Sequence, residues 1–549
     1  MYKSFLNYRR IHRSKVYQRD RSFVGVTPIG LVIIPYLRSM VHGLLNLVLL
    51  VVATTFCPSQ GSQQLRREYA SFTIDTSEII GDFWDSGSVL AKLQTPRLVA
   101  LTHALGPAFI RLGGTDADNT FWNISAAPGK PLPPTYPNGP RYSINSTKMG
   151  ILCNFINSTG TRLVLGLNGG FANGTRDAKN GYAWMPESAT NLLKALVHPT
   201  SSCYGKLFAV ELSNEPNLFL ETQKHILTGK QLAADYKVLR ATLDSIDPSI
   251  KIAGVDVAYQ IPIVGSLLPT TSEFLEHGGM ESIDFLTWHW YAMESKRCPF
   301  HGRFAPASQK GAISTSTMDK GNKWANRMNA LVKKYQLSVE LWMGEMSLVS
   351  CGGAVNITDS FAGTFWYLDE LAHLAVQGHS VTFRQTLVGS RYGLIEQSSL
   401  QPLPDYWGLL LFRSLVGQRV LGIEVHNSQG RFVRAYAFES VLNASNVVVL
   451  VLNVSPEKSA TISGNENTIV VANQDLTRVS KGRTEYVVTA SGDSEPLSAK
   501  GVCINGGPPL VVGGDNFVPD LVRLGTTVGA NLSHMPLVLP PLSYAFLTI

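Results

Sequence analysis

The sequence predicts an α/β protein: a (β/α)8 TIM barrel followed by a C-terminal β-sandwich domain. The first observation is a repeated alternation of short apolar runs with helix-like segments between residues 71 and 387. These runs are apolar on both faces, as parallel strands are when helices cover them. The second observation is a change beyond about residue 417, where strand-like runs follow one another across Gly, Asn, Ser and Pro turns. The first pattern is typical of a barrel and the second of a sandwich.

The elements can be placed along the chain. The stretch Gly229–Ser245 shows helical periodicity, with apolar residues at Leu232, Tyr236, Leu239 and Leu243. The expected barrel strands are 72–76, 108–115, 162–169, 208–216, 250–256, 283–291, 339–347 and 380–387. Expected sandwich strands include 447–452, 468–471, 486–488 and 542–549. We therefore divide the chain into a leader (1–64), a (β/α)8 barrel (65–416) and a sandwich (417–549).

The leader accounts for the net charge of the chain. Residues 1–39 hold eight Lys and Arg against one Asp, which equals the formal net charge of +7. The remainder is neutral, so the global charge says nothing about the ligand. We expect no nucleic-acid partner. The apolar run from Val41 to Phe56 is shorter than the roughly 20 residues of a membrane span, which favours a cleaved signal peptide, with Met40 as a possible start. A type II signal anchor is the alternative, and it would be the one contact with a membrane.

Sequons and cysteines agree with a secretory route. Eight Asn-x-Ser/Thr sequons follow the leader, which predicts a glycoprotein that is secreted, extracellular or lysosomal. Of the five cysteines beyond the leader, at least one is free or pairs between chains. No two of them have the C-x-x-C spacing, so we expect no structural zinc. We expect a monomer.

Two glutamates end apolar runs and indicate the chemistry. Glu215 ends the fourth expected strand, within Asn214-Glu215-Pro216, and Glu345 ends the seventh. In a barrel, residues at the C-terminal ends of strands face the catalytic mouth. A retaining glycoside hydrolase needs two carboxylates about 5–5.5 Å apart, one as acid/base and one as nucleophile. We predict Glu215 as acid/base and Glu345 as nucleophile, with no metal and no organic cofactor.

Other polar residues at strand ends have expected roles beside this pair. Asn214 is expected to bind the sugar 2-hydroxyl, and Tyr291 to bind and hold Glu345. Arg111 or Arg384 is expected to stabilise the negative charge of the nucleophile.

Four further polar residues leave alternatives open. His289 is a candidate for proton transfer or simply a hydrogen-bonded histidine at the mouth. Asp75 and Asp256 could do no more than bond neighbouring backbone. Glu211 alternates away from the mouth, which favours a structural role in the packed interior or the helix layer.

Several motifs together resemble one family. They are Ser213–Asn217, Gly344-Glu345 with Cys351-Gly352-Gly353, Arg111–Thr115 and Pro402–Trp407. In this order, from about Ser71 to the C-terminus, the chain resembles heparanases and their group, glycoside hydrolase family 79. That group also includes β-glucuronidases and a hyaluronidase.

The resemblance implies a retaining endo-β-glucuronidase that cleaves heparan sulfate, with Glu215 as acid/base and Glu345 as nucleophile. It also implies a set of sugar-contacting positions, in which Gly352 and Gly353 offer backbone N–H groups to the uronate carboxylate. These positions are Asp75, Thr115, Asn214, Gly352, Gly353 and Tyr392.

The chain departs from heparanase in two places. Only residues 116–143 follow the Gly-Gly-Thr strand, where the vertebrate enzyme carries a long excised linker, so two-chain maturation is not expected. A basic run after the fifth strand is replaced by residues 259–263. Other cations on mouth loops could bind an anionic polysaccharide in its place. They are Arg176, Lys179, Lys224, Lys296, Arg297, Arg303 and Arg391.

Cys298 and Cys351 follow strands six and seven, so a disulfide across the mouth is a further hypothesis.

Two other functions stay open. One is an exo-acting or hyaluronan-cleaving β-glucuronidase, favoured by the lost basic run. The other is a non-catalytic heparan-sulfate-binding protein, which the two glutamates argue against.

Overall fold

A computed structural model describes most of the chain beyond the leader. The described ranges are 64–81, 88–124, 142–171, 175–258, 270–298, 304–427, 430–463, 467–471, 474–475, 482–492, 495–532 and 534–549. The predicted signal peptide or anchor lies outside these ranges, as do residues 259–263. Within the ranges, no helix is long and apolar enough to cross a membrane.

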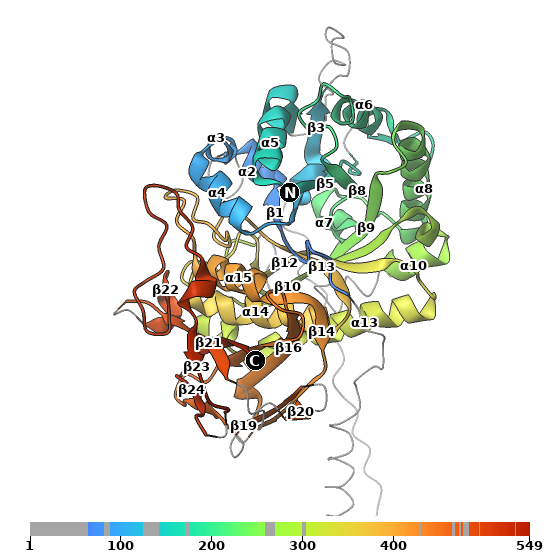
Figure 1. Ribbon diagram of the computed structural model, residues 1–549. Helices are drawn as coiled ribbons and strands as arrows, with labels where there is room; N and C mark the ends of the chain where they lie inside the picture. The colour runs from blue at the N-terminus through green and yellow to red at the C-terminus, as the bar shows by residue number, and fades with distance from the viewer. Residues whose placement is uncertain are drawn as a thin grey trace, which may run out of the picture. The chain divides into compact units, whose positions relative to one another are not determined.

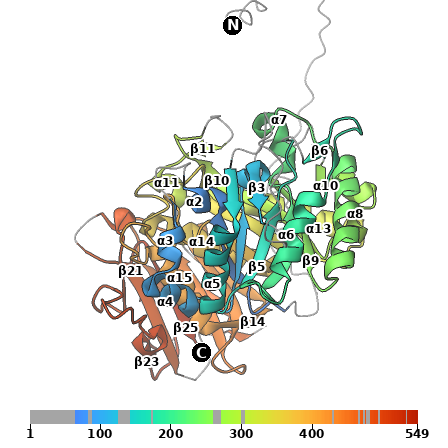
Figure 2. The ribbon, with the colours of Figure 1, turned by 90° about the horizontal axis from the view of Figure 1, so that it is seen from above.

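The predicted TIM barrel is confirmed. In the described residues, eight parallel strands pair in chain order and the last pairs with the first, which closes the barrel (Figures 1 and 2). The strands are β1 (Ala70–Asp75), β2 (Phe109–Gly113), β5 (Arg162–Leu167), β8 (Leu207–Leu212), β9 (Lys251–Ala258), β10 (Phe285–Glu294), β12 (Glu340–Ser350) and β13 (His379–Arg384). β10 and β12 run further than expected because they stay paired as far as Glu294 and Ser350.

Helices surround the barrel (Figure 2). The longer ones are α4 (Pro96–Ala104), α5 (Ser146–Thr159), α6 (Glu187–Leu196), α8 (Gly229–Ile246), α10 (Thr270–Glu276), α13 (Lys320–Lys334), α14 (Phe361–Val376) and α15 (Pro404–Leu415). In α8, the Thr228 hydroxyl caps the first turn by accepting the Gln231 N–H at 3.1 Å. Leu232, Tyr236 and Leu239 are buried against the strands, as their spacing predicts.

Short elements connect the barrel strands. They are α2 (Thr76–Ile80), α3 (Leu90–Leu93), α7 (Phe219–Thr222), α11 (Gln309–Ala312), α12 (Thr315–Met318), η1 (Thr115–Asn119), η2 (Pro216–Leu218) and η3 (Gly279–Ser282). Two small sheets pair β3 (Thr120–Asn123) with β4 (Tyr142–Asn145) and β6 (Arg176–Asp177) with β7 (Ala183–Trp184). β11 (Ala305–Pro306) pairs in parallel with the end of β10.

An aromatic layer fills the N-terminal part of the barrel interior. The rings of Phe285 and Trp342 stack with centroids 3.8 Å apart, and Phe109 lies 5.7 Å from Trp342. Side chains alternate along a strand, so the residue two positions further on also points inward. Arg111 and Thr287 occupy such positions and are buried. The barrel therefore has an apolar floor with polar side chains above it.

The C-terminal domain is made of two packed sheets, which confirms the predicted sandwich. The larger sheet contains β14 (Val416–Leu421), β16 (Val433–Ser440), β17 (Val447–Asn453), β25 (Ser543–Thr548), β21 (Arg483–Ala490), β22 (Val502–Ile504) and β23 (Thr526–Val528). The other contains β15 (Ile423–Asn427), β19 (Asn467–Val471), β18 (Ala460–Ile462), β24 (Leu537–Leu539) and β20 (Gln474–Asp475). Val449, Ile462, Leu539 and Leu547 belong to the apolar layer between them. Three 3-10 turns complete the domain: η4 (Gly430–Phe432), η5 (Pro496–Ser498) and η6 (Leu521–Leu524).

Helix α14 carries an acidic pair beside the C-terminal domain (Figure 1). Asp369 accepts hydrogen bonds from Arg434 Nε at 2.5 Å and from the Tyr436 hydroxyl at 2.7 Å. Its neighbour Glu370 is buried, and neither of its carboxylate oxygens has a hydrogen-bond partner among the described residues. Burial, and then the charge of Asp369, raise the pKa of Glu370 to about 8. Glu370 is therefore mainly protonated at neutral pH.

A pH-dependent stability difference should follow. Because the pKa of Glu370 is about 8 when folded against an ordinary value of 4.5, the folded chain binds the extra proton between these values and loses stability as pH rises through them. Glu370→Gln cannot ionise, so its stability relative to the wild type should increase by roughly 3–4 kcal/mol between pH 5 and pH 8. Thermal unfolding of both proteins at the two pH values measures this. Glu276→Gln, at an exposed glutamate, is the control, and a Glu370→Gln difference that is equal at both pH values would contradict the assignment.

Candidate active site

The two predicted glutamates lie close together in the barrel. Glu215 follows β8 with a left-handed φ of +50°, and its N–H donates to the carbonyl of Asp256 at 3.0 Å. Glu345 lies in β12 opposite His289 of β10. One oxygen of each carboxylate and one nitrogen of His289 lie within 4.8 Å of one another. The Glu215 side chain is 14% exposed against 7% for Glu345, so Glu215 is the more open of the two.

Glu345 is held from two sides. Arg111 Nη1 lies 2.8 Å from its Oε2, and the Tyr291 hydroxyl donates to its Oε1. The same guanidinium binds Glu211 through Nε at 2.7 Å and the Asn214 side-chain oxygen through Nη2 at 3.1 Å. One carboxylate oxygen of Glu345 thus faces a cation and the other a hydroxyl, which fixes the orientation of the group.

Arg111 is thus the expected arginine that contacts Glu345. Arg384 points elsewhere: its Nη2 binds Asp405 at 2.8 Å and its Nη1 donates to the Ser347 hydroxyl at 3.1 Å. Glu211 does lie in the packed interior, as expected, but it does so as the second carboxylate partner of Arg111.

His289 connects Glu215 to a third carboxylate. Its Nδ1 lies 3.3 Å from Glu215 Oε1 and its Nε2 3.3 Å from Asp256 Oδ1. Burial alone would lower the pKa of His289, but the carboxylates of Glu345, Asp256 and Glu215 raise it to about 10. An imidazolium donates from both nitrogens and has no lone pair for a metal. The trio Glu215, His289 and Glu345 therefore suits carboxylate chemistry better than metal binding.

Asp256 does more than bond neighbouring backbone, which was the simpler expectation. Burial would raise its pKa, but the hydrogen bond from His289 and the charge of Arg111 lower it. Asp256 is therefore the permanent counter-ion of His289. The sequence signal for this pair was only that both residues lie near strand ends.

Asp75 and Tyr392 border the same site. Asp75 Oδ1 caps α2 by accepting the Ser77 N–H at 2.9 Å, and its Oδ2 accepts Gln385 Nε2 at 2.8 Å. Gln385 Nε2 also lies 3.2 Å from the Tyr392 hydroxyl. Burial, followed by the charge of Glu345, raises the pKa of Asp75 to about 7. Gln385 was missed by the sequence reasoning, although it directly follows the eighth strand.

A buried aspartate supports the residue beside the acid. Asp118 accepts the backbone N–H of Asn214 at 2.7 Å and that of Gly169 at 2.9 Å. Nothing in the sequence identified Asp118. Thr115 begins the same 3-10 turn and is exposed, so the structure leaves its expected sugar contact as a prediction. Gly114 precedes it with a φ of +97°, where a Cβ would lie 2.4 Å from Asp75 Oδ2.

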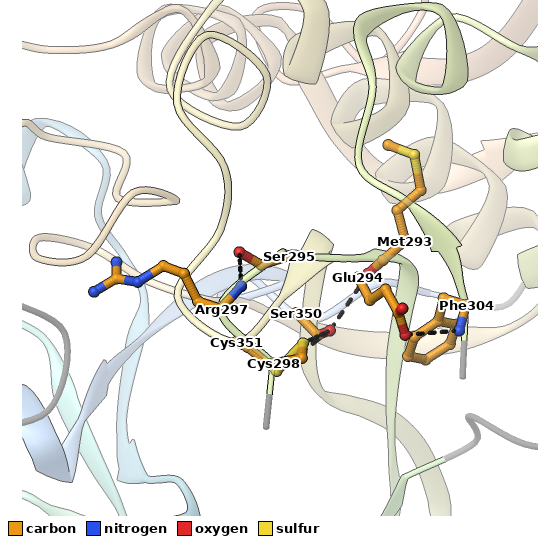
Figure 3. Close-up of a disulfide and its surroundings, with 8 residues drawn as sticks. All are labelled: Met293, Glu294, Ser295, Arg297, Cys298, Phe304, Ser350 and Cys351. Atoms are coloured by element: carbon orange, nitrogen blue, oxygen red, sulfur yellow. Dashed lines mark hydrogen bonds between the residues drawn. A yellow bond between two sulfur atoms is a disulfide. The ribbon is translucent and has the colours of Figure 1, made fainter. Parts of the chain in front are cut away.

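The hypothesised disulfide between Cys298 and Cys351 is present (Figure 3). It directly precedes Gly352 and Gly353, which both have a left-handed φ, of +80° and +78°. The Gly353 N–H makes only a long hydrogen bond of 3.4 Å, to the carbonyl of Ser350. A second disulfide joins Cys153 to Cys203. Cys503 has no disulfide partner in the part of the chain that the structure describes, in agreement with the odd count of five.

The expected cations divide into two groups. Lys179, Lys224, Lys296 and Arg391 are exposed on loops that follow barrel strands, and Arg297 is half-buried. The expectation for Arg176 was wrong, because its guanidinium is buried and binds Asp235 at 2.7 Å. Arg303 lies outside the described residues.

Residues 81–372 match the family model "Glycosyl hydrolase family 79, N-terminal domain", a range that contains both glutamates. The chain belongs to glycosyl hydrolase family 79. Heparanase from Mus musculus is 29% identical over 429 residues, which cover 70% of this chain and 74% of that protein. Inactive heparanase-2 from Homo sapiens is 25% identical over 576 residues, covering 92% of this chain and 88% of that protein.

One solved structure shares the whole architecture of this family 79 chain. A 4-O-α-L-rhamnosyl-β-D-glucuronidase from Fusarium oxysporum 12S aligns with a TM-score of 0.58 and 16% identity, over 90% of this chain and 98% of that one. At this identity the similarity shows the fold alone.

The charge of His289 can be tested by its titration. With a pKa of about 10, His289 should stay an imidazolium from pH 5.5 to 8.5, whereas the imidazole of a fully solvated model peptide loses its proton near pH 6.5. Glu345→Gln removes a carboxylate that raises this pKa, so the same ring should then titrate at lower pH. NMR of histidine-labelled protein measures both, with His289→Gln assigning the signal. A wild-type midpoint below pH 7 would contradict the assignment.

Proposed function

We propose that the protein is a retaining endo-β-glucuronidase. It cleaves internal linkages of glycosaminoglycans, heparan sulfate first among them. The observation that carries the reaction type is the carboxylate pair, whose nearest oxygens lie within 4.8 Å. An inverting enzyme needs roughly 6.5–9.5 Å between its carboxyl groups to admit a water, whereas a retaining one needs about 5–5.5 Å. So close an approach favours the retaining mechanism.

The environments of the two glutamates fit two different roles. Glu345, fixed by Arg111 and Tyr291, attacks the anomeric carbon, while Glu215 protonates the leaving oxygen. Glu215, the more open side chain, then activates a water that releases the sugar from Glu345. Asn214 accepts from Arg111 through its side-chain oxygen, which leaves its NH2 group to donate to the sugar 2-hydroxyl.

Substrate class rests on the relatives and on the mouth loops. A relative is named heparanase, and Lys179, Lys224, Lys296 and Arg391 add exposed positive charge on loops at the C-terminal side of the barrel. Such charge attracts a polyanion even when the domain as a whole is neutral. The Gly352–Gly353 turn would take the uronate carboxylate. The similarity to an inactive heparanase-2 keeps a non-catalytic binding protein as the rival, and the paired glutamates favour catalysis.

The two disulfides also support the expected route through the cell. Disulfides persist in oxidising compartments and are rare in the cytosol. Together with the predicted signal peptide, they support a glycoprotein that is secreted or lysosomal.

Product analysis tests the proposed function. The purified protein is offered heparan sulfate, hyaluronan and an aryl β-glucuronide, with Glu345→Gln and Glu215→Gln as controls. We expect mid-length oligosaccharides from heparan sulfate, β-configured products at first release, and a loss of at least 10²–10⁴-fold in both variants. Release from the aryl glucuronide alone would make the protein an exo-enzyme, and cleavage of hyaluronan alone would change the substrate. Binding without turnover of any of the three would favour the binding protein.

A milder change tests how Glu345 is held. Tyr291→Phe removes the hydroxyl that donates to Glu345, and a hydrogen bond to a charged group is worth about 1.5–3 kcal/mol. We therefore expect kcat to fall roughly 10- to 100-fold with little change in KM. Tyr335→Phe is the matched control, because that hydroxyl donates to a carboxylate, Glu276, on the outer helices at 2.7 Å. Equal activity of the two variants would show that the Tyr291 hydroxyl does not contribute to catalysis.

A further inference from the structure

β10 and β12 leave the barrel side by side and are joined just beyond their last pair. Glu294 and Ser350 are the last residues in register, and the disulfide between Cys298 and Cys351 follows at once, with a Cα–Cα distance of 5.2 Å. Figure 3 shows Ser350 beside the two cysteines, with its hydroxyl 3.4 Å from the Met293 carbonyl and 3.4 Å from Cys298 Sγ. The loops after strands six and seven therefore leave the barrel as one connected unit.

The residues after this bond form an unusual turn. Cys351, Gly352 and Gly353 have successive φ values of +55°, +80° and +78°. A non-glycine residue in this region costs roughly 1–2 kcal/mol and persists only where its surroundings enforce it. The turn has little hydrogen bonding of its own, since the Gly353 N–H reaches the Ser350 carbonyl only at 3.4 Å.

The far side of the turn is held by the loop after β13. The Arg391 N–H donates to the Gly352 carbonyl at 2.9 Å, and the Thr358 hydroxyl donates to the Arg391 carbonyl at 2.6 Å. A Cβ on Gly353 would lie 2.6 Å from the Thr358 hydroxyl oxygen, so the turn also packs closely here. The disulfide is thus the one covalent restraint on a turn whose other restraints are hydrogen bonds and packing.

We propose that the Cys298–Cys351 disulfide positions the Gly352–Gly353 turn and thereby sets the selectivity of the enzyme for uronates over neutral sugars. The inference rests on the proposed β-glucuronidase function, in which this turn meets the substrate carboxylate. Backbone N–H groups of a turn bind an anion well only when they point to one place. The disulfide at Cys351 keeps these N–H groups oriented before the substrate binds, and such preorganisation raises affinity. Glu345 lies in β12 and Glu215 shortly follows β8, so neither belongs to the loops that the disulfide joins.

The test compares two substrates that differ only at C5: an aryl β-glucuronide and the aryl β-glucoside, whose hydroxymethyl group replaces the carboxylate. In the double variant Cys298→Ser/Cys351→Ser, kcat/KM for the glucuronide should fall about 10- to 100-fold, mainly through KM, as expected for loss of a charge-assisted hydrogen bond. The lower kcat/KM for the glucoside should change less than about twofold. The preference for the uronate should therefore fall by the same 10- to 100-fold.

The chain provides a matched control in its other disulfide. Cys153 lies in α5 and Cys203 in the segment that leads into β8, at the opposite end of that strand from Glu215, and both are buried. Cys153→Ser/Cys203→Ser should lower the melting temperature and leave the uronate preference unchanged. If the first double variant does not fold, limited phosphine reduction of the folded wild type replaces it. Cys351 is half-buried, so alkylation mapping should show that its disulfide opens first.

The outcomes separate this inference from the proposed function. An unchanged preference, or equal losses on both substrates, would overturn the positioning role while leaving the glucuronidase intact. If the wild type does not hydrolyse the glucuronide, calorimetry measures binding of the same compound to the wild type and to the double variant. This shows whether the turn binds the carboxylate and whether the disulfide affects that binding. Weaker binding by the variant would support the turn as a carboxylate site in a non-catalytic protein. No binding to either protein would overturn both proposals.

Discussion

The site depends on one buried cation. Arg111 is 1% exposed and lies directly above the aromatic floor of the barrel. A buried charge is tolerated only where opposite charges and hydrogen bonds surround it. Its partners Glu211 and Asn214 come from β8 and the loop after it, and Glu345 comes from β12, so strands two, four and seven meet at one guanidinium. Removing any one partner leaves part of that charge uncompensated, which links the stability of the barrel to the geometry of its site.

A second cation explains how two carboxylates can lie so close. Glu215 and Glu345 would repel each other at this separation if nothing intervened. His289, an imidazolium bound to Asp256, lies beside Glu215, while Arg111 lies beside Glu345. Each carboxylate thus has its own positive neighbour: the imidazolium of His289 beside Glu215 and the guanidinium of Arg111 beside Glu345. Different neighbours give two chemically identical groups different environments, as the two proposed roles require.

The strands and the loops contribute different parts of the site. The glutamates and their partners come from strands or strand ends that the barrel holds rigidly, with an apolar layer beneath them. The surfaces that would select a substrate lie on the loops that follow, where sequence can vary without disturbing the barrel. The extended pairing of β10 with β12 and the disulfide beyond it give two of these loops a rigidity closer to that of the strands.

Much of this could be predicted from the sequence, because it is local. Runs that are apolar on both faces identified the eight strands, and Glu215 and Glu345 were identified because they lie near the ends of two predicted strands. The rest depends on residues far apart in the sequence. Arg176 looked like a surface cation, but it binds Asp235, 59 positions away. Arg384, equally well placed by sequence, faces Asp405 instead of Glu345.

The sequence by itself therefore determined the barrel, the sandwich and the two carboxylates, since alternation and strand ends are properties of short segments. Only the tertiary structure decided which cation serves which carboxylate. It also decided that His289 carries a charge, that Asp118 and Gln385 support the site, and that Cys298 reaches Cys351. These are contacts between residues on different strands and loops, and no short stretch of sequence contains them.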